Sequence, residues 1–93
     1  MESFAAKTYL KAEARAWLRH NDGTTEVVTI VPKEGFEAAG QCYEIYTAYD
    51  ERPAYLGRIL FDEQGYWIYD GDTLQVDEQE QLGHFILNYV ERI

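Results

Sequence analysis

Histidine, cysteine and serine, which often serve as general base, soft metal ligand or nucleophile, are rare in this sequence. The histidines are His20 and His84, the one cysteine is Cys42 and the one serine is Ser3. A hydrolase needs a serine or cysteine beside a histidine, and Ser3 lacks the glycine-flanked turn that presents such a nucleophile. The glycines are scattered and form no phosphate-binding loop. We therefore expect no catalysis and no cofactor.

Structural roles are predicted for the histidines and the cysteine. His84 lies opposite the apolar stripe of a predicted helix and is therefore exposed, and His20 lies in a turn, so we expect no shared metal or acid–base role. Cys42 opens a predicted strand, and the sequence next to it supplies no basic residue to favour its thiolate. We expect a buried, unreactive thiol, and a single cysteine cannot close an intrachain disulfide.

The densest acidic stretch runs from a predicted turn into the start of a predicted helix. Its carboxylates are Asp70, Asp72, Asp77, Glu78 and Glu80. Carboxylates suit Ca²⁺ or Mg²⁺, but the stretch lacks the ligand register and the closing glutamate of a calcium loop. The favoured interpretation is a solvated turn followed by a first helical turn. A cation site or small-ligand site near Asp70 is the third hypothesis for function.

The charge balance argues against nucleic acids and membranes as partners. Eight basic and seventeen acidic residues give a net charge of −9, which repels phosphates and anionic lipid headgroups. Residues 1–19 hold four basic and two acidic residues, and residues 20–93 hold four basic and fifteen acidic residues, so the balances are +2 and −11. The basic residues of the first part share one face in a helix or in a strand: Lys7, Lys11, Arg15 and Arg19. This candidate basic strip is either a solvated face or a docking strip for an acidic partner.

Length and composition predict one small globular domain over residues 1–93. A chain of 93 residues leaves no room for two cores, and 46% hydrophobic residues exclude a disordered chain. The sequence starts without a basic region followed by a long apolar run, and no stretch approaches the ~18 apolar residues of a membrane span. We expect a cytoplasmic protein.

Residues 77–93 predict an amphipathic helix. Apolar residues recur there at helical spacing: Leu82, Phe85, Ile86, Tyr89, Val90 and Ile93. Asp77 and Glu80 have the spacing of a capping box at its start. Gly83 costs a helix about 1 kcal/mol relative to alanine, so we expect this helix to depend on packing against a sheet.

Four runs rich in β-branched and aromatic residues predict strands: residues 26–31, 42–49, 55–61 and 66–69. Residues 62–65 read as a hairpin loop with Gly65 in the left-handed conformation, and residues 50–54 read as a second turn. In the second run Tyr43, Ile45, Thr47 and Tyr49 share one face, and the more apolar face of the sheet is expected to meet the helix. The predicted fold is α+β, an antiparallel sheet of four to five strands with the C-terminal helix packed on one face.

Residues 3–20 permit two structures. Five alanines favour a helix, with a stripe that includes Leu10, Trp17 and Leu18. Strict alternation around Leu10 and Leu18 permits a strand instead, with residues 20–23 as a hairpin loop. We favour the helix and keep the strand as the alternative.

Aromatic residues are concentrated in the predicted sheet. Eight of the fourteen fall between Tyr43 and Tyr69, and one helix covers only one face, so we expect some of them on the open face. The candidate interaction surface consists of Tyr46, Tyr55, Tyr66, Trp67 and Tyr69. Exposed tyrosine and tryptophan are typical anchors of protein interfaces.

One segment resembles known sequences. The residues Gly-Tyr-Trp-Ile-Tyr-Asp-Gly-Asp at positions 65–72, leading into Glu-Gln-Glu-Gln-Leu at positions 78–82, resemble small uncharacterised proteins found in cyanobacterial genomes. The resemblance implies a bacterial cytoplasmic protein. It implies no activity, ligand or site residue.

The function expected from these patterns is a non-catalytic protein–protein interaction module. Its contact surface would be the aromatic sheet face and the loop at residues 32–41, its protein partner is unknown, and the chain would be a monomer or a weak homodimer. The alternative is an acidic mimic of nucleic acid that inhibits a DNA-handling protein, with carboxylates in place of phosphates. A partner held by the aromatic face survives high salt, whereas modest salt releases a partner held by charge mimicry.

Overall fold

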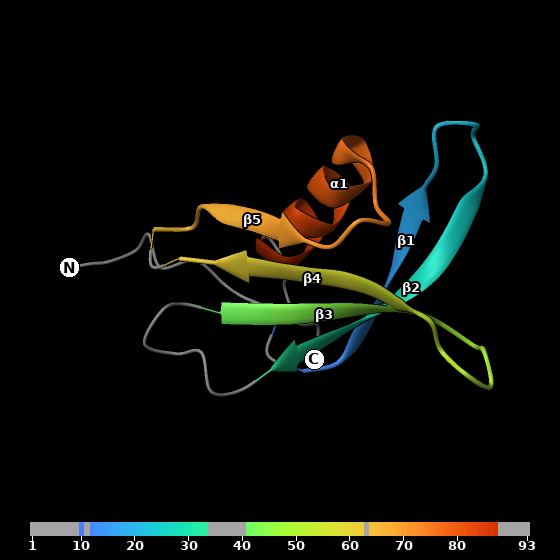
Figure 1. Ribbon diagram of the computed structural model, residues 1–93, viewed down its shortest axis with the longest axis horizontal. Helices are drawn as coiled ribbons and strands as arrows, with labels where there is room; N and C mark the ends of the chain where they lie inside the picture. The colour runs from blue at the N-terminus through green and yellow to red at the C-terminus, as the bar shows by residue number, and fades with distance from the viewer. Residues whose placement is uncertain (1–9, 11, 34–40, 63, 88–93) are drawn as a thin grey trace, which may run out of the picture.

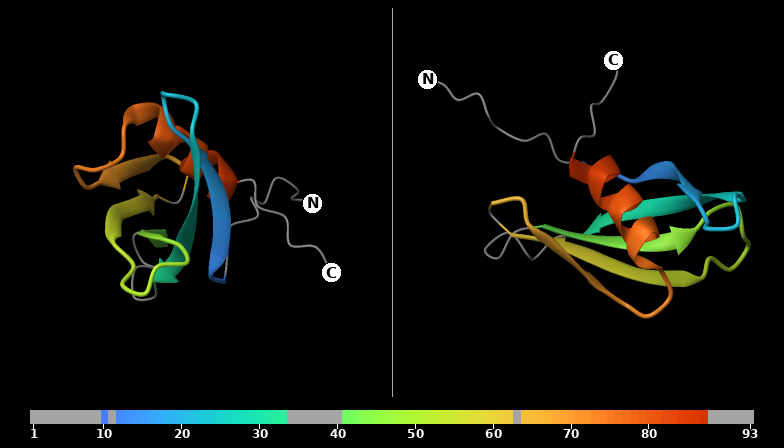
Figure 2. Two further views of the ribbon diagram at one scale, coloured as in Figure 1. Left: turned by 90° about the vertical axis from the view of Figure 1, so that its right-hand side faces the viewer. Right: turned by 90° about the horizontal axis from the view of Figure 1, so that it is seen from above.

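The computed structural model of this chain describes residues 10, 12–33, 41–62 and 64–87. They form a five-stranded antiparallel sheet followed by a helix. The strands are β1 (Ala14–Arg19), β2 (Thr25–Lys33), β3 (Gln41–Thr47), β4 (Tyr55–Phe61) and β5 (Trp67–Asp70), and the helix is α1 (Val76–Leu87). Strand order in the sheet follows sequence order, so β1 and β5 are its edges. Because α1 lies on one face of the sheet (Figures 1 and 2), the predicted α+β architecture is confirmed.

The described part of residues 3–20 corrects the favoured helix. Ala14–Arg19 is a strand that pairs with β2. Ala16 and Leu18 point into the core, while Trp17 on the opposite side of the strand is exposed. Pairing with β2 and burial of alternate residues outweigh the helix propensity of the alanines. Residues 3–9 and 11 lie outside the described residues.

Two hairpin turns form where the sequence predicts them. The β1–β2 turn closes with a hydrogen bond of 2.8 Å from the His20 N–H to the Thr24 carbonyl. In the β4–β5 turn the Asp62 carboxylate accepts hydrogen bonds from the N–H groups of Gln64 and Tyr66. Gly65 there has a φ of 91°, a conformation that favours glycine. The loop predicted at residues 62–65 is confirmed, and the turn at residues 20–23 is the hairpin loop of the strand alternative.

The core lies between the sheet and α1. Most of its buried side chains come from the helix and from every strand but β5, and they include Ala16, Leu18, Val28, Ile30, Tyr43, Ile45, Ile59, Phe61, Leu82 and Ile86. The Tyr43 hydroxyl donates a 2.8 Å hydrogen bond to the Leu10 carbonyl, so this buried phenol is satisfied. The more apolar sheet face meets the helix, as predicted.

The start of α1 differs from the expected capping box. The helix begins at Val76, and the Gln75 N–H donates a 2.9 Å hydrogen bond to Oε1 of Glu78. This contact is the reciprocal half of a capping box, with Gln75 before the helix and Glu78 at its third position. The predicted pair, Asp77 and Glu80, is therefore two residues too far along the chain. Glu78 itself is buried.

Candidate functional site

The face of the sheet that points away from α1, called the outer face below, carries rows of side chains aligned across the strands. In one row Arg15 lies opposite Thr29, Thr29 opposite Tyr46 and Tyr46 opposite Tyr55. A bulge between Ile45 and Tyr46 shifts the register so that the two tyrosines face each other. No helix or strand of the described residues covers this face (Figures 1 and 2).

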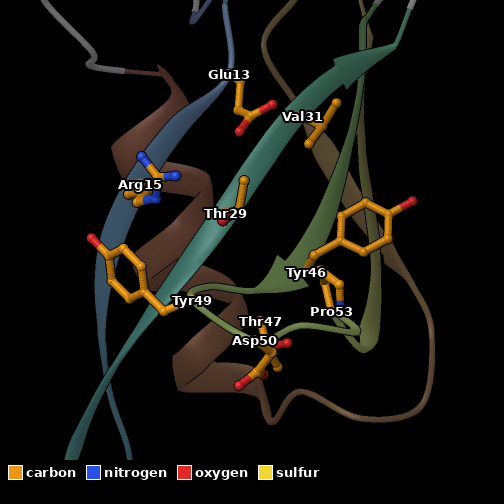
Figure 3. Close-up of a pocket in the computed structure, with 9 residues that line it drawn as sticks. All are labelled: Glu13, Arg15, Thr29, Val31, Tyr46, Thr47, Tyr49, Asp50 and Pro53. Carbon is orange, nitrogen blue, oxygen red and sulfur yellow. The ribbon is translucent and has the colours of Figure 1, made fainter.

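A groove of about 520 Å³ lies on the outer face next to the β3–β4 loop. It is lined by Glu13, Arg15, Thr29, Val31, Tyr46, Thr47, Tyr49, Asp50 and Pro53. Figure 3 shows these side chains in front of the sheet, with α1 behind it. The groove combines aromatic and aliphatic walls with both signs of charge, a composition common in binding sites.

Tyr49 forms one wall of the groove through an unusual backbone conformation. Its φ is 66°, which is uncommon for a residue other than glycine, asparagine or aspartate. Its side chain is 79% exposed, and the Arg15 guanidinium lies 5.2 Å from the centre of its ring (Figure 3). This cation–π contact connects the β3–β4 loop to β1. The sequence pattern placed Tyr49 in a strand on the face of Tyr43, which is wrong because β3 ends at Thr47.

Tyr46 and Tyr55 form the adjoining aromatic patch. Their ring centres are 5.5 Å apart, and Tyr55 is 51% exposed. The Tyr46 hydroxyl donates a 2.7 Å hydrogen bond to the Glu44 carboxylate, and this bond, with partial burial, raises the pKa of Tyr46. The phenol is therefore neutral at physiological pH and is held in one orientation.

The remaining residues of the candidate interaction surface lie elsewhere. Tyr66 is exposed in the β4–β5 turn. Trp67 packs beneath α1, with its ring centre 6.5 Å from that of Phe61. The Tyr69 hydroxyl donates to the Leu56 carbonyl on the side of the core. Trp67 and Tyr69 are thus not part of the outer face, because β5 presents the alternate residues, such as the exposed Ile68, on that side.

The candidate basic strip is described only in part. Arg15 and Arg19 are exposed on the same side of β1, with the exposed Trp17 between them. Lys7 and Lys11 lie outside the described residues, as do residues 34–40 of the predicted contact loop. Pro32 and Gln41, at the ends of that loop, belong to β2 and β3.

His20 joins the β1–β2 turn to the start of α1. Its Nδ1 lies 2.7 Å from Oε2 of Glu78, and its Nε2 lies 2.9 Å from Oε1 of Glu26. The hydrogen bonds to these two carboxylates raise the pKa of His20. Burial works to raise the pKa of Glu78, but the hydrogen bonds from His20 and the Gln75 N–H outweigh it, so the net shift is downward. Both ring nitrogens are occupied, which leaves neither for a substrate.

Cys42 is a buried thiol, as predicted. It is 1% exposed, and this burial raises its pKa, so the thiolate is disfavoured. Within the described ranges, no three histidine, cysteine or acidic residues are grouped so as to hold a metal ion. His84 is exposed on α1.

Comparisons with known proteins identify no relative of this chain from which a function could be inferred. No family model, curated protein or solved structure matches this chain. Of the residues that the structure describes, no helix has the length and apolar character needed to cross a membrane. The groove on the outer face is therefore the feature from which a function is inferred.

Proposed function

We propose that this protein is a non-catalytic protein-binding module, and that the groove on the outer face binds an extended segment of its partner. The observation that carries the proposal is the groove of about 520 Å³ between Tyr46, Tyr49 and Pro53, on the sheet face opposite α1. Tyrosine supplies a large apolar contact area with few rotatable bonds, and for this reason it is enriched at binding hot spots.

The charges around the groove favour a basic segment. Glu13 and Asp50 line it, and the whole chain has a net charge of −9. Among the described lining residues the basic one is Arg15, and its guanidinium lies against the Tyr49 ring. A partner segment with a lysine or arginine beside proline or other apolar residues would pair with the carboxylates and lie against the tyrosine rings.

The polar groups elsewhere support a function without catalysis. The His20 imidazole is held between Glu26 and Glu78. The Cys42 thiol is buried and its pKa is raised. Neither side chain is arranged as a nucleophile or a general base.

Selection of peptides from a random displayed library tests this function. Tyr49→Asn removes the aromatic wall, and asparagine tolerates the left-handed backbone at this position. Tyr66→Asn is the matched control, because Tyr66 is similarly exposed but lies in the β4–β5 turn. We expect the enriched peptides to be basic and to bind Tyr49→Asn at least tenfold more weakly than wild type, while Tyr66→Asn binds them normally.

Two results would count against the proposal. One is equal affinity of the enriched peptides for wild type and Tyr49→Asn, with both proteins folded by circular dichroism. The other is binding that modest salt abolishes and the tyrosines do not influence, because exposed ion pairs are screened within about 8 Å at physiological ionic strength. That second result would favour the nucleic-acid mimic instead.

A further inference from the structure

The two edges of the sheet are protected differently. At β1 the Gln81 amide holds the Arg19 backbone, and α1 lies along that edge. β5 forms the opposite edge, and no strand or helix of the described residues runs along its outer side (Figures 1 and 2). Proteins commonly protect an exposed strand edge with lysine or proline, and residues 66–70 contain neither. The β5 edge is therefore open to a further strand.

The direction of the backbone groups along β5 follows from its hairpin with β4. The Asp62 N–H donates a 2.8 Å hydrogen bond to the Tyr66 carbonyl, so these two residues form a hydrogen-bonded pair. Such pairs alternate along antiparallel strands, so Ile68 also directs its N–H and C=O groups to β4. The backbone groups of Trp67 and Tyr69 therefore point to the open edge.

The side chains that alternate with these two residues are exposed. Tyr66 is 73% exposed, and Ile68 is 66% exposed. The next residue on that side, Asp70, is paired with Arg58, whose Nε lies 2.8 Å from Oδ2 of the carboxylate. The edge thus offers an aromatic ring and an aliphatic side chain without an unpaired charge between them.

We propose that two copies of this chain associate through their β5 edges, antiparallel, with a two-fold axis at Ile68. Ile68 then lies opposite Ile68 of the second copy in a non-hydrogen-bonded pair, where side chains approach each other most closely. Trp67 lies opposite Tyr69 of the second copy, and each such pair exchanges both of its backbone hydrogen bonds. Tyr66 lies opposite Asp70 of the second copy. The two sheets become one continuous sheet.

Neighbouring registers form fewer hydrogen bonds. An axis at Trp67 places Tyr69 opposite Gly65, which belongs to the turn and has a φ of 91°. An axis at Tyr69 places Trp67 opposite Gly71, which lies beyond the end of β5. Of these registers, the axis at Ile68 alone forms every edge hydrogen bond between residues of β5.

Sedimentation velocity over a range of protein concentrations tests this association. Wild type is expected to shift from monomer to dimer between micromolar and millimolar protein. Ile68→Lys places like charges opposite each other at the axis and should raise the dimer dissociation constant about tenfold or more. Val76→Lys is the matched control, because Val76 is 68% exposed at the start of α1 and the change in charge is the same. Circular dichroism verifies the fold of each variant.

A mixture of two variants tests the position of the axis. Ile68→Lys and Ile68→Glu each place like charges at the axis, whereas their heterodimer places opposite charges there. The mixture should therefore associate more tightly than either variant alone. Added salt should strengthen the wild-type dimer, because two chains of net charge −9 repel each other.

Four outcomes would overturn the proposal or its register. Wild type that stays monomeric at every concentration, or a dimer that added salt dissociates, overturns the proposal. A dimer that Ile68→Lys weakens no more than Val76→Lys does overturns the β5 interface. A mixture that associates no more tightly than the single variants overturns the axis at Ile68. None of these outcomes depends on whether the groove binds peptides, because β5 contributes no residue to its described lining.

Discussion

At the scale of single residues, Gly83 shows how a contact decides the effect of a substitution. A methyl group added there would lie 2.7 Å from the Trp67 ring, whereas an ordinary van der Waals contact is longer. Alanine normally stabilises a helix by about 1 kcal/mol relative to glycine. Here we expect Gly83→Ala to destabilise the protein by about 1–3 kcal/mol, because the indole must move. Urea unfolding measures the change.

A second variant separates crowding from helix propensity at Gly83. In a Trp67→Leu background the ring is absent, so alanine should regain its ordinary helical advantage. A double-mutant cycle would then show strong coupling between positions 67 and 83. If Gly83→Ala stabilises the protein in the wild-type background, the tight packing of Trp67 against α1 is wrong.

The His20 cluster predicts a specific pH dependence of stability. The raised pKa of His20 means that its contribution is complete below the ordinary value of 6.5 and is lost as pH rises through the raised folded value. The lowered pKa of Glu78 means that its contribution is present above the ordinary value of 4.5 and is lost as pH falls through the folded value. The charged cluster therefore stabilises the fold most between pH 4.5 and 6.5.

Comparison with His20→Gln isolates this contribution. Glutamine can still hydrogen bond to Glu26 or Glu78, but it carries no titratable charge. We expect the stability advantage of wild type over this variant, from urea midpoints at several pH values, to shrink from pH 6 to pH 9. An advantage that grows over that range would show that His20 is held neutral.

At the scale of elements, the edge of β1 depends on α1. The Gln81 amide makes both of its hydrogen bonds to the Arg19 backbone, in place of a neighbouring strand. Exposed hydrogen bonds contribute modestly, so we expect Gln81→Ala to cost about 1 kcal/mol of stability and to speed hydrogen exchange of the Arg19 amide. Glu80→Ala, at the adjacent exposed position, is the control. Unchanged exchange at Arg19 would argue against this edge contact.

Local sequence patterns predicted most elements, and the exceptions depend on the pairing between strands. Strands β2 to β5, the turns at Gly23 and Gly65 and the buried Leu82 and Ile86 all follow from side-chain period and turn residues. β1 was ambiguous because alanine suits a helix, while the partner that makes it a strand, β2, lies beyond a turn. The faces of Trp67 and Tyr69 depend on a register that short strands define weakly.

The candidate site was harder to predict because its contacts join distant segments. Tyr46 and Tyr55 were identified from composition, but their ring contact depends on a bulge. Tyr49 was misplaced since nothing in its neighbours signals a φ of 66°. His20 meets Glu78 across 58 positions of sequence, a separation that no local pattern spans.

At the scale of the whole molecule, the two faces of the sheet have different roles: one packs against α1, and the other is exposed. One sheet face and α1 enclose the core, while the outer face carries exposed tyrosines and the groove. The net charge of −9 favours encounter with a basic partner, and the aromatic walls supply contacts that salt does not screen.

The most direct test of the central claim is a nuclear magnetic resonance titration of ¹⁵N-labelled protein with a basic peptide selected from the library. The account predicts saturable shifts at the amides of Arg15, Tyr46 and Tyr49, and little change at Trp67 or along α1. Shifts concentrated at α1 and His20 instead, with the outer face unmoved, would contradict it.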